Sequence, residues 1–327
     1  MTKATEIWVL TDGRTGNEVQ ALALAEAVAR RRPGRITVKR TPLKRWASWV
    51  PAAVSYRLGA SKGGWPFIGI EDGASSLTWP WPGLIVSAGR RVAPISAALR
   101  KLHGIPAVHL LDPEVPKAAF DAVILPRHDN KSGANIIPSL GALSRHNRQS
   151  LEAAAASWRC PVEGLKLPRL AVLIGGPSRS ADFTDEDAQR LVLALDGLAN
   201  RFGLMITASR RTPEAIVARL RDALAGRAFI WAGETDGPNP YPGLLGPAVA
   251  VVVTEDSVNM ASEAASTGKP VHVFPITRVA PKLAQFHADL RDYGATQRFT
   301  GEIRHWSYQP LAEADRVAKD LIRRSVI

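Results

Sequence analysis

Short apolar runs alternate with helix-like segments along the chain, and this alternation constrains the fold more than any other feature. In the first half, the runs that fit buried strands are EIWVL (6–10), RITVKR (35–40), GLIVSAG (83–89), AVHLL (107–111) and FDAVILP (120–126). Helical patterns at 18–32 and 93–104 lie between them. Parallel strands need crossover helices, so this rhythm predicts a parallel sheet covered by helices.

The rhythm lapses around residues 139–166, where a polar helix and the segment CPVEGLKLP indicate a linker. It restarts with LAVLIGG (170–176) and continues through apolar runs at 204–209, 229–233, 248–253 and 271–275. We therefore expect an α/β protein with two Rossmann-like doubly wound domains, 1–165 and 166–327. An amphipathic helix at 310–324 ends the chain and is a candidate for packing back on the N-terminal domain.

The composition is that of a soluble globular protein, with 46% hydrophobic and 22% charged residues among 327. The single cysteine, Cys160, excludes an intrachain disulfide and favours a reducing compartment. No apolar run reaches the roughly 18 residues of a membrane span, and the first ten residues do not resemble a signal peptide. These features predict a cytoplasmic protein.

Positive charge is concentrated in one window. The net charge is +12, and residues 27–70 contain ten basic and no acidic residues: Arg30, Arg31, Arg32, Arg35, Lys39, Arg40, Lys44, Arg45, Arg57 and Lys62. Such a block favours an anionic partner, namely phospholipid, nucleic acid or a phosphorylated substrate, and the alternative is a solvated basic surface. No nucleic-acid-binding motif accompanies it, so nucleic acid is the least favoured partner.

Tryptophans gather in the same region. Five of the nine lie between residues 46 and 81: Trp46, Trp49, Trp65, Trp79 and Trp81. Apolar residues at intervals of three or four (Leu43, Trp46, Val50, Val54 and Leu58) indicate one helical face that Pro51 interrupts. This face either binds an anionic membrane surface, as a peripheral protein on the inner side of the cytoplasmic membrane would, or packs against the N-terminal sheet.

Ligands of doubly wound folds bind at the carboxyl ends of the strands, which selects the loops to consider. In the first half, TDGRTGNE (11–18) offers two glycines for close backbone approach and two carboxylates that are general bases or helix caps: Asp12, Gly13, Gly16 and Glu18. Arg90 in SAGRRVAP (87–94) suits a phosphate or carboxylate, or lies in solvent. Asp129, beside His128, is an acid–base candidate or part of an ordinary surface loop.

In the second half, three strand-end loops combine glycines, hydroxyls and cations. They supply Gly175, Gly176, Ser178 and Arg179 from the first, Ser209 and Arg210 from the second, and Asp256, Ser257, Asn259 and Glu263 from the third. The third opens a helix whose N–H groups suit an anion, and Glu263 suits ribose hydroxyls. Together the loops predict a diphosphate-bearing ligand. The alternative is that Asp256 and Ser257 only cap the helix.

The motifs TDGRTGNEVQALALAEAV, SAGRR, HLLDP, PRHD, GGPSR, SRRTP and TEDSVNMASEAASTGKPVHVF are spread over most of the chain. Together they resemble the mitochondrial-fission (elongated-mitochondria) factor family, and the chain looks like a bacterial member. This resemblance implies a non-catalytic, membrane-associated adaptor.

The same residues are similar to GT-B glycosyltransferases, which pair two Rossmann-like domains across a cleft. That resemblance implies a nucleotide-sugar donor on the C-terminal domain, with Glu263 at the ribose and 256–259 at the diphosphate. It implies no metal in the site and no permanently bound cofactor. Related enzymes of peptidoglycan and lipid A synthesis end the first loop in His or Asp, whereas this chain has Asn17, a poor base. The base role would then fall to Asp12, Glu18 or Asp129.

The leading prediction is a GT-B-like protein that binds a nucleotide-diphosphate sugar and transfers the sugar to an envelope or lipid-linked acceptor. The acceptor would enter near Gly13, Gly16, Asn17 and Arg90. The alternative is the adaptor of the fission-factor type. The sequence leaves open the sugar, the base, the acceptor, the oligomeric state and whether catalysis is retained.

Overall fold

The computed structural model describes residues 5–61, 64–72, 75–157 and 164–327. Cys160 and Lys62 lie outside the described residues. The chain forms two units. Unit 1 comprises Met1–Arg145 and Ala312–Ile327, and unit 2 comprises His146–Leu311.

Unit 1 is built on a six-stranded parallel sheet in the order β2-β1-β3-β4-β5-β6. Its strands are β1 (Thr5–Thr11), β2 (Gly34–Arg40), β3 (Leu84–Ala88), β4 (Ala107–Leu110), β5 (Ala122–Pro126) and β6 (Ile136–Ser139). Its helices are α1 (Thr15–Ala29), α2 (Ala52–Arg57), α3 (Ala93–His103) and α10 (Glu313–Arg323), with 3-10 turns at Ala47–Trp49, Phe67–Gly69, Lys117–Ala119 and Arg127–Asp129.

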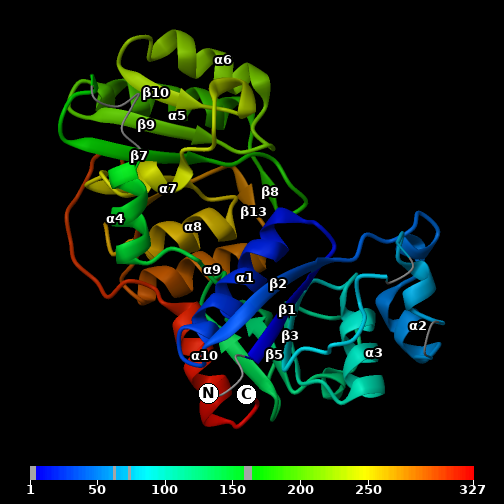
Figure 1. Ribbon diagram of the computed structural model, residues 1–327. Helices are drawn as coiled ribbons and strands as arrows, with labels where there is room; N and C mark the ends of the chain where they lie inside the picture. Colours follow the sequence, from blue (N-terminus) through cyan, green and yellow to red (C-terminus); the bar gives the residue numbers. More distant parts are fainter. Residues whose placement is uncertain (1–4, 62–63, 73–74, 158–163) are drawn as a thin grey trace. The chain divides into compact units, whose positions relative to one another are not determined.

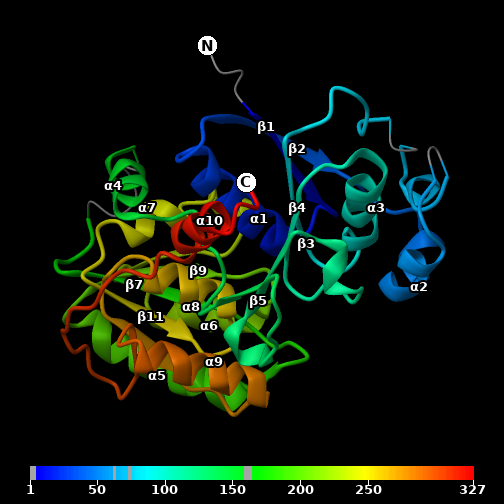
Figure 2. The same ribbon diagram turned by 90° about the horizontal axis from the view of Figure 1, so that it is seen from below.

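Alternation along β1 sends its side chains into two hydrophobic cores, one on each face of the sheet. Ile7 and Val9 pack with α1 and α10, while Trp8 and Leu10 pack with α3. Figures 1 and 2 show α1 beside α10 in both views. The sheet therefore has helices on both sides, as the continuous apolar strands predict.

Helix α10 is joined to the rest of unit 1 by charged side chains. Asp315 accepts from Arg31 at 2.6 Å and from Arg30 at 3.1 Å, both at the end of α1. The buried Glu313 accepts the backbone N–H of Leu140 at 2.8 Å and a bidentate pair from Arg316. Two cations of the basic block thus have a structural role.

Unit 2 contains a second six-stranded parallel sheet, in the order β10-β9-β7-β11-β12-β14, and a small hairpin sheet of β8 and β13. The strands are β7 (Arg169–Ile174), β8 (Ala181–Asp182), β9 (Gly203–Ala208), β10 (Ala228–Trp231), β11 (Ala250–Thr254), β12 (Val271–Phe274), β13 (Arg278–Val279) and β14 (Thr296–Arg298). The helices are α4 (Arg148–Ser157), α5 (Asp185–Ala199), α6 (Glu214–Ala223), α7 (Tyr241–Leu245), α8 (Val258–Ala265) and α9 (Pro281–Asp292), with a 3-10 turn at Glu234–Asp236.

The predicted fold class is confirmed, since each half of the chain forms a parallel sheet with helices between its strands. Every apolar run named above forms a strand. The pattern missed β6, β8, β13 and β14, which are short and lack a long apolar run. The polar helix expected in the linker is α4, and it belongs to unit 2, where it packs on α7. Within the described part of the chain, no helix is long and apolar enough to cross a bilayer.

The apolar helix suggested for 43–58 is interrupted. Residues 47–49 form a 3-10 turn, the chain is extended at Val50 and Pro51, and α2 begins only at Ala52. Proline lacks the N–H that an uninterrupted helix would use here. Trp46, Trp49, Val54 and Leu58 remain exposed, with Trp49 80% accessible.

Glu313→Ala should destabilise unit 1, because it leaves the buried Leu140 N–H without its acceptor and removes the bidentate partner of Arg316. Losing such a buried acceptor typically costs about 1–3 kcal/mol. Urea unfolding followed by circular dichroism would measure the shift. Lys319→Ala, an exposed position on the same helix, is the control and should change the midpoint little. Equal effects of the two substitutions would contradict the role given to Glu313.

Candidate functional site

The carboxyl ends of β9, β7 and β11 are neighbours in the sheet of unit 2, so the loops that follow them meet. They meet at Asp256, whose side chain is fully buried. Its carboxylate accepts the Gly176 N–H at 2.9 Å, the Thr254 hydroxyl at 2.6 Å and the Arg211 guanidinium at 2.6 Å. One carboxylate therefore joins three loops that sequence reasoning proposed as one site.

Gly175 and Gly176 allow this close approach. A Cβ on Gly175 would overlap the Asp256 carboxylate, and one on Gly176 would overlap the backbone carbonyl of Arg211. Their N–H groups donate to Thr254 Oγ1, at 2.8 Å, and to Asp256. The predicted phosphate cradle thus has its two glycine donors already engaged within the protein. The glycines position the loops.

The remaining residues of the first two loops lie at the surface. Ser178 and Ala181 close a tight turn that leads into β8, and Arg179 is exposed in it. In the second loop, the Ser209 N–H donates to Thr212 Oγ1 at 2.9 Å, and Arg210 is exposed. Arg211, rather than Arg210, reaches Asp256.

The third loop leads into helix α8. Ser257 caps this helix by accepting the Met260 N–H at 3.3 Å. The alternative prediction, that this residue is a helix cap, therefore holds for Ser257. The N–H groups of Val258 and Asn259, in the first turn, have no partner within the helix. Asn259 and Glu263 are four residues apart, which places them on one face of α8.

Glu263 lies in a perturbed environment. Burial raises its pKa to about 7, and the nearby Tyr241 hydroxyl acts in the opposite direction. Burial and the charge of Glu263 together raise the pKa of Tyr241 well above its usual value, and the hydroxyl of Tyr241 is itself buried. Perturbed carboxyl groups of this kind cluster at functional sites. Sequence reasoning missed Tyr241, which lies 22 positions before Glu263 in the proline-rich PNPYPG.

Lys269 stabilises the end of α7, the helix that begins at Tyr241. Its ammonium donates to the carbonyls of Leu245, at 2.6 Å, and Gly246, where α7 ends. A cation at a helix C-terminus is favourable because the free carbonyls there carry partial negative charge. Burial lowers the pKa of Lys269 to about 8. The lysine of the GKP motif thus holds α7, the helix that starts at Tyr241.

Unit 1 carries the other predicted residues. Asp12 and Glu18 flank the start of α1: Asp12 pairs with Arg14 at 3.4 Å and Glu18 with Arg40 at 3.1 Å. Asp129 follows β5, three strands away from β1 in the sheet, so the three candidate bases do not share one loop cluster.

The predicted acceptor-side residues near α1 have local structural roles. Gly13 has a φ of +82°, in the left-handed region that favours glycine. Gly16 lies inside α1, where its carbonyl accepts from Gln20 at 3.3 Å. The Asn17 amide packs against Gly89, where a Cβ would overlap it. Asn17 therefore joins the start of α1 to the loop after β3.

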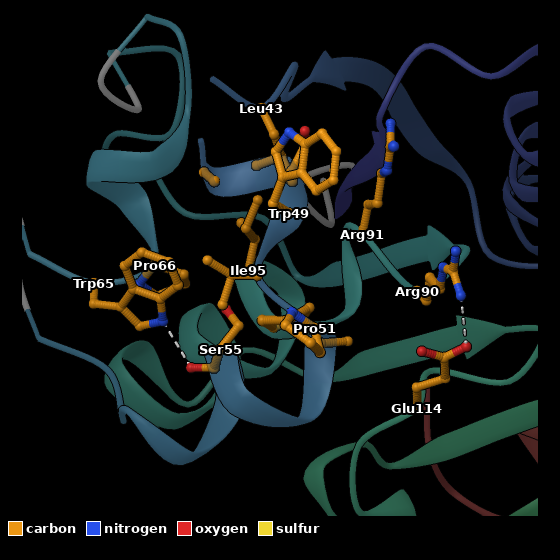
Figure 3. A pocket seen from close by; sticks show the side chains of 15 residues that line it. Leu43, Trp49, Pro51, Ser55, Trp65, Pro66, Arg90, Arg91, Ile95 and Glu114 are labelled. Carbon is orange, nitrogen blue, oxygen red and sulfur yellow. Dashed lines mark hydrogen bonds and ion pairs between the residues drawn. The ribbon is translucent and has the colours of Figure 1, made fainter. Parts of the chain in front are cut away.

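Arg90 pairs with Glu114 at 3.0 Å at the edge of a pocket of about 230 Å³ (Figure 3). The pocket is formed by the segment from Leu43 to Ser55, by Trp65 and Pro66, and by the loop from Arg90 to Ile95. Sequence reasoning singled out these tryptophans and arginines separately and did not bring them together.

Comparison with known proteins places the chain in a family. Residues 15–325 match the family model described as Mitochondrial fission ELM1. The chain belongs to this ELM1 family. This confirms the resemblance derived from its motifs.

Two known proteins are similar to the chain in sequence. The chain is 31% identical to "Mitochondrial fission protein ELM1" of Arabidopsis thaliana over 278 residues, which cover 74% of this chain and 65% of the plant protein. It is 28% identical to "Uncharacterized protein RP120" of Rickettsia prowazekii (strain Madrid E), covering 96% of both proteins. The chain thus spans just under two thirds of the plant relative.

Solved structures confirm a GT-B-like fold for this ELM1-family member. A putative UDP-N-acetylglucosamine 2-epimerase from Listeria monocytogenes has a TM-score of 0.58 at 14% identity, covering 99% of this chain and 97% of the epimerase. The UDP-GlcNAc 2-epimerase of Methanocaldococcus jannaschii has the same TM-score at 12% identity, covering 98% and 100%. At these identities the likeness concerns the fold.

Asp256→Asn should loosen all three loops of unit 2, because it removes the charge that Arg211 pairs with and one acceptor of the Gly176 N–H. Arg211 is 39% exposed, so the cost is that of losing buried hydrogen bonds, about 1–3 kcal/mol. Urea unfolding would show a lower midpoint for the transition of unit 2. Asp185→Asn is the control, since Asp185 is 80% exposed and 3.5 Å from its arginine. An unchanged midpoint for Asp256→Asn would refute its role as the hub of the loops.

Proposed function

We propose that this ELM1-family protein binds a nucleotide-diphosphate sugar at the carboxyl ends of β7, β9 and β11 in unit 2. The observation that supports this most is the junction of three loops at Asp256, which fixes the start of α8 and so the positions of Asn259 and Glu263. Ligands of doubly wound folds bind at this edge of the sheet. One structural neighbour of the same fold, the M. jannaschii epimerase, has been solved in complex with UDP-GlcNAc and UDP, at a TM-score of 0.53.

The roles of the residues follow from what the structure leaves accessible. The first-turn N–H groups of α8, at Val258 and Asn259, and the positive end of its dipole suit the diphosphate. Glu263 would accept hydrogen bonds from the ribose hydroxyls. Two exposed cations, Arg179 of the first loop and Arg210 of the second, are suited to neutralise charge on the departing diphosphate. Asp256, Gly175 and Gly176 would act by positioning the loops, because their polar groups are already paired.

Transfer of the sugar to an envelope or lipid-linked acceptor is the second part of the proposal. The acceptor would approach unit 1 near Gly13, Asn17 and Arg90. Asp12, Glu18 and Asp129 stay candidates for the base. Of these, Asp12 and Glu18 lie beside the start of α1 together with Asn17, which makes them the better placed pair.

Glu263→Gln should weaken binding of UDP-GlcNAc about tenfold or more, since a hydrogen bond to a charged group contributes about 1.5–3 kcal/mol. Titration calorimetry would measure the dissociation constant. Because the pKa of Glu263 is about 7, the wild-type carboxyl is neutral at lower pH and binds hydroxyls less well. Wild-type affinity should therefore fall about tenfold from pH 8 to pH 6, while the Gln variant shows no such slope.

Glu186→Gln is the matched control, because Glu186 is exposed on α5 in the same unit. It should leave both the affinity and its pH dependence unchanged. Titration with a panel of nucleotide sugars that differ in base and in sugar would identify the preferred donor. If the wild-type protein binds no nucleotide or nucleotide sugar of the panel, the donor-site proposal is wrong.

A membrane-associated adaptor is the second candidate function. The observation that favours it is the exposed apolar surface of unit 1 around α2: Trp46 is 51%, Trp49 80%, Val54 44% and Leu58 63% accessible. Lys44, Arg45 and Arg57 lie in the same segment. Tryptophans beside cations are typical of surfaces that contact anionic lipid.

The wild-type protein should co-sediment with vesicles that contain anionic lipid, and should do so less as salt is added. Each cation near such a surface contributes about 1 kcal/mol, so the triple variant Lys44→Glu, Arg45→Glu, Arg57→Glu should stay in the supernatant. The control is Lys101→Glu, Arg298→Glu, Lys319→Glu, which changes the net charge equally at exposed positions elsewhere. Equal loss in both triple variants would mean that overall charge matters and not this surface.

A further inference from the structure

We infer that the pocket between the segment 43–55 and the start of α3 binds a single lipid with a phosphate headgroup. The proposal concerns unit 1 alone. Its role as the acceptor site rests on the donor function proposed above, whereas binding of the lipid does not.

The floor of the pocket carries buried apolar side chains, while polar groups make up the larger part of the surface that faces the cavity. The apolar side chains are small or aliphatic and come from three parts of unit 1: Ala47, Ala52, Pro66, Pro94 and Ile95. Trp65 forms one wall, fixed by the hydrogen bond that its indole N–H donates to the Ser55 carbonyl at 2.7 Å. Figure 3 shows this pair on one side of the pocket and the arginines on the other. A ligand between them meets these apolar side chains together with the polar groups of Ser48 and Ser55.

The rim on the arginine side is positively charged. It carries two guanidinium groups and one carboxylate, that of Glu114, which pairs with Arg90. Arg91 is exposed and, among the residues that the structure describes, has no ion-pair partner. Both arginines follow β3 directly, after Gly89 at a φ of +88°, so the turn is fixed by the sheet. An arginine fork with no carboxylate partner suits a phosphate group.

Apolar side chains next to an arginine that has no ion-pair partner among the described residues suit an amphiphile, which has an apolar chain and an anionic head. A cavity of about 230 Å³ is larger than the roughly 150 Å³ that holds one benzene, which suits part of an alkyl or prenyl chain. Trp49, 80% exposed at the rim, and the neighbouring Trp46 continue the apolar surface outward, where the rest of a lipid chain would lie.

Alkyl phosphates below their micelle concentration are the probes, measured by calorimetry on the full chain. Each methylene transferred from water should tighten binding about fourfold, until the pocket is full and the series levels off. Inorganic phosphate alone and the matching alkyl alcohols should bind at least tenfold more weakly than the longest alkyl phosphate. Affinity independent of chain length, or equal affinity for inorganic phosphate, would overturn the inference.

Arg91→Ala should weaken alkyl phosphate binding about tenfold or more and leave alkyl alcohol binding unchanged. Arg45→Ala is the control, because Arg45 is an exposed cation of the same segment that does not line the pocket. Trp49→Ala should reduce the gain per methylene. Equal effects of Arg91→Ala and Arg45→Ala would show that only general charge attracts the ligand, and would refute the site.

Two further measurements separate this inference from the other proposals. Binding to anionic vesicles without binding to monomeric alkyl phosphates would refute the pocket and favour a bilayer-contacting surface. Titration of the Arg91→Ala variant with UDP-GlcNAc should match the wild type, since the proposed donor site lies in unit 2. A donor site that fails in the wild type while alkyl phosphates bind would leave the pocket standing and remove its role as an acceptor site.

Discussion

The buried carboxylate of Asp256 is the interaction on which the candidate donor site depends. An ionised carboxylate out of water is costly unless hydrogen bonds and a counter-ion surround it. Here the Gly176 N–H and Arg211 do so from the loops after β7 and β9, and the Thr254 hydroxyl does so from the end of β11 itself. The loops can therefore not be placed independently. The start of α8, and with it Asn259 and Glu263, takes its position from this requirement.

The two units use similar sheets for different surfaces. In unit 2 the strand-end loops are bound to one another. The groups left for a ligand are the first-turn N–H groups of α8 and the carboxyl group of Glu263, whose pKa is raised by burial. In unit 1 the loop after β3 turns at Gly89 and presents Arg90 and Arg91 beside a pocket that also holds apolar side chains. A polar nucleotide and an apolar chain would each find suitable chemistry on a different unit. This division fits the two-part reaction that we propose.

Several residues of the predicted donor site have structural roles in place of the ligand contacts predicted for them. The paired glycines were predicted to approach a phosphate, yet they approach Asp256 and the Arg211 carbonyl. Ser257 caps α8, and the GKP lysine holds the end of α7. Such residues occur at ligand sites because the loops there must be tightly packed, so a motif can point to a site without touching the ligand. Tyr241 was missed because its partner, Glu263, is distant in sequence and lies on another helix.

The sequence by itself determined most strands of the two parallel sheets, because a buried central strand needs a continuous apolar run, whereas the edge strands β6 and β14 lack one. It also determined that the three strand-end loops of the second half belong together, since such loops meet at one edge of the sheet. Only the tertiary structure decided which polar atoms are already engaged. Arg211 and not Arg210 pairs with Asp256, and Arg91 stays accessible while Arg90 pairs with Glu114. These choices depend on distances of a few ångströms between residues far apart in the chain, which neither composition nor periodicity records.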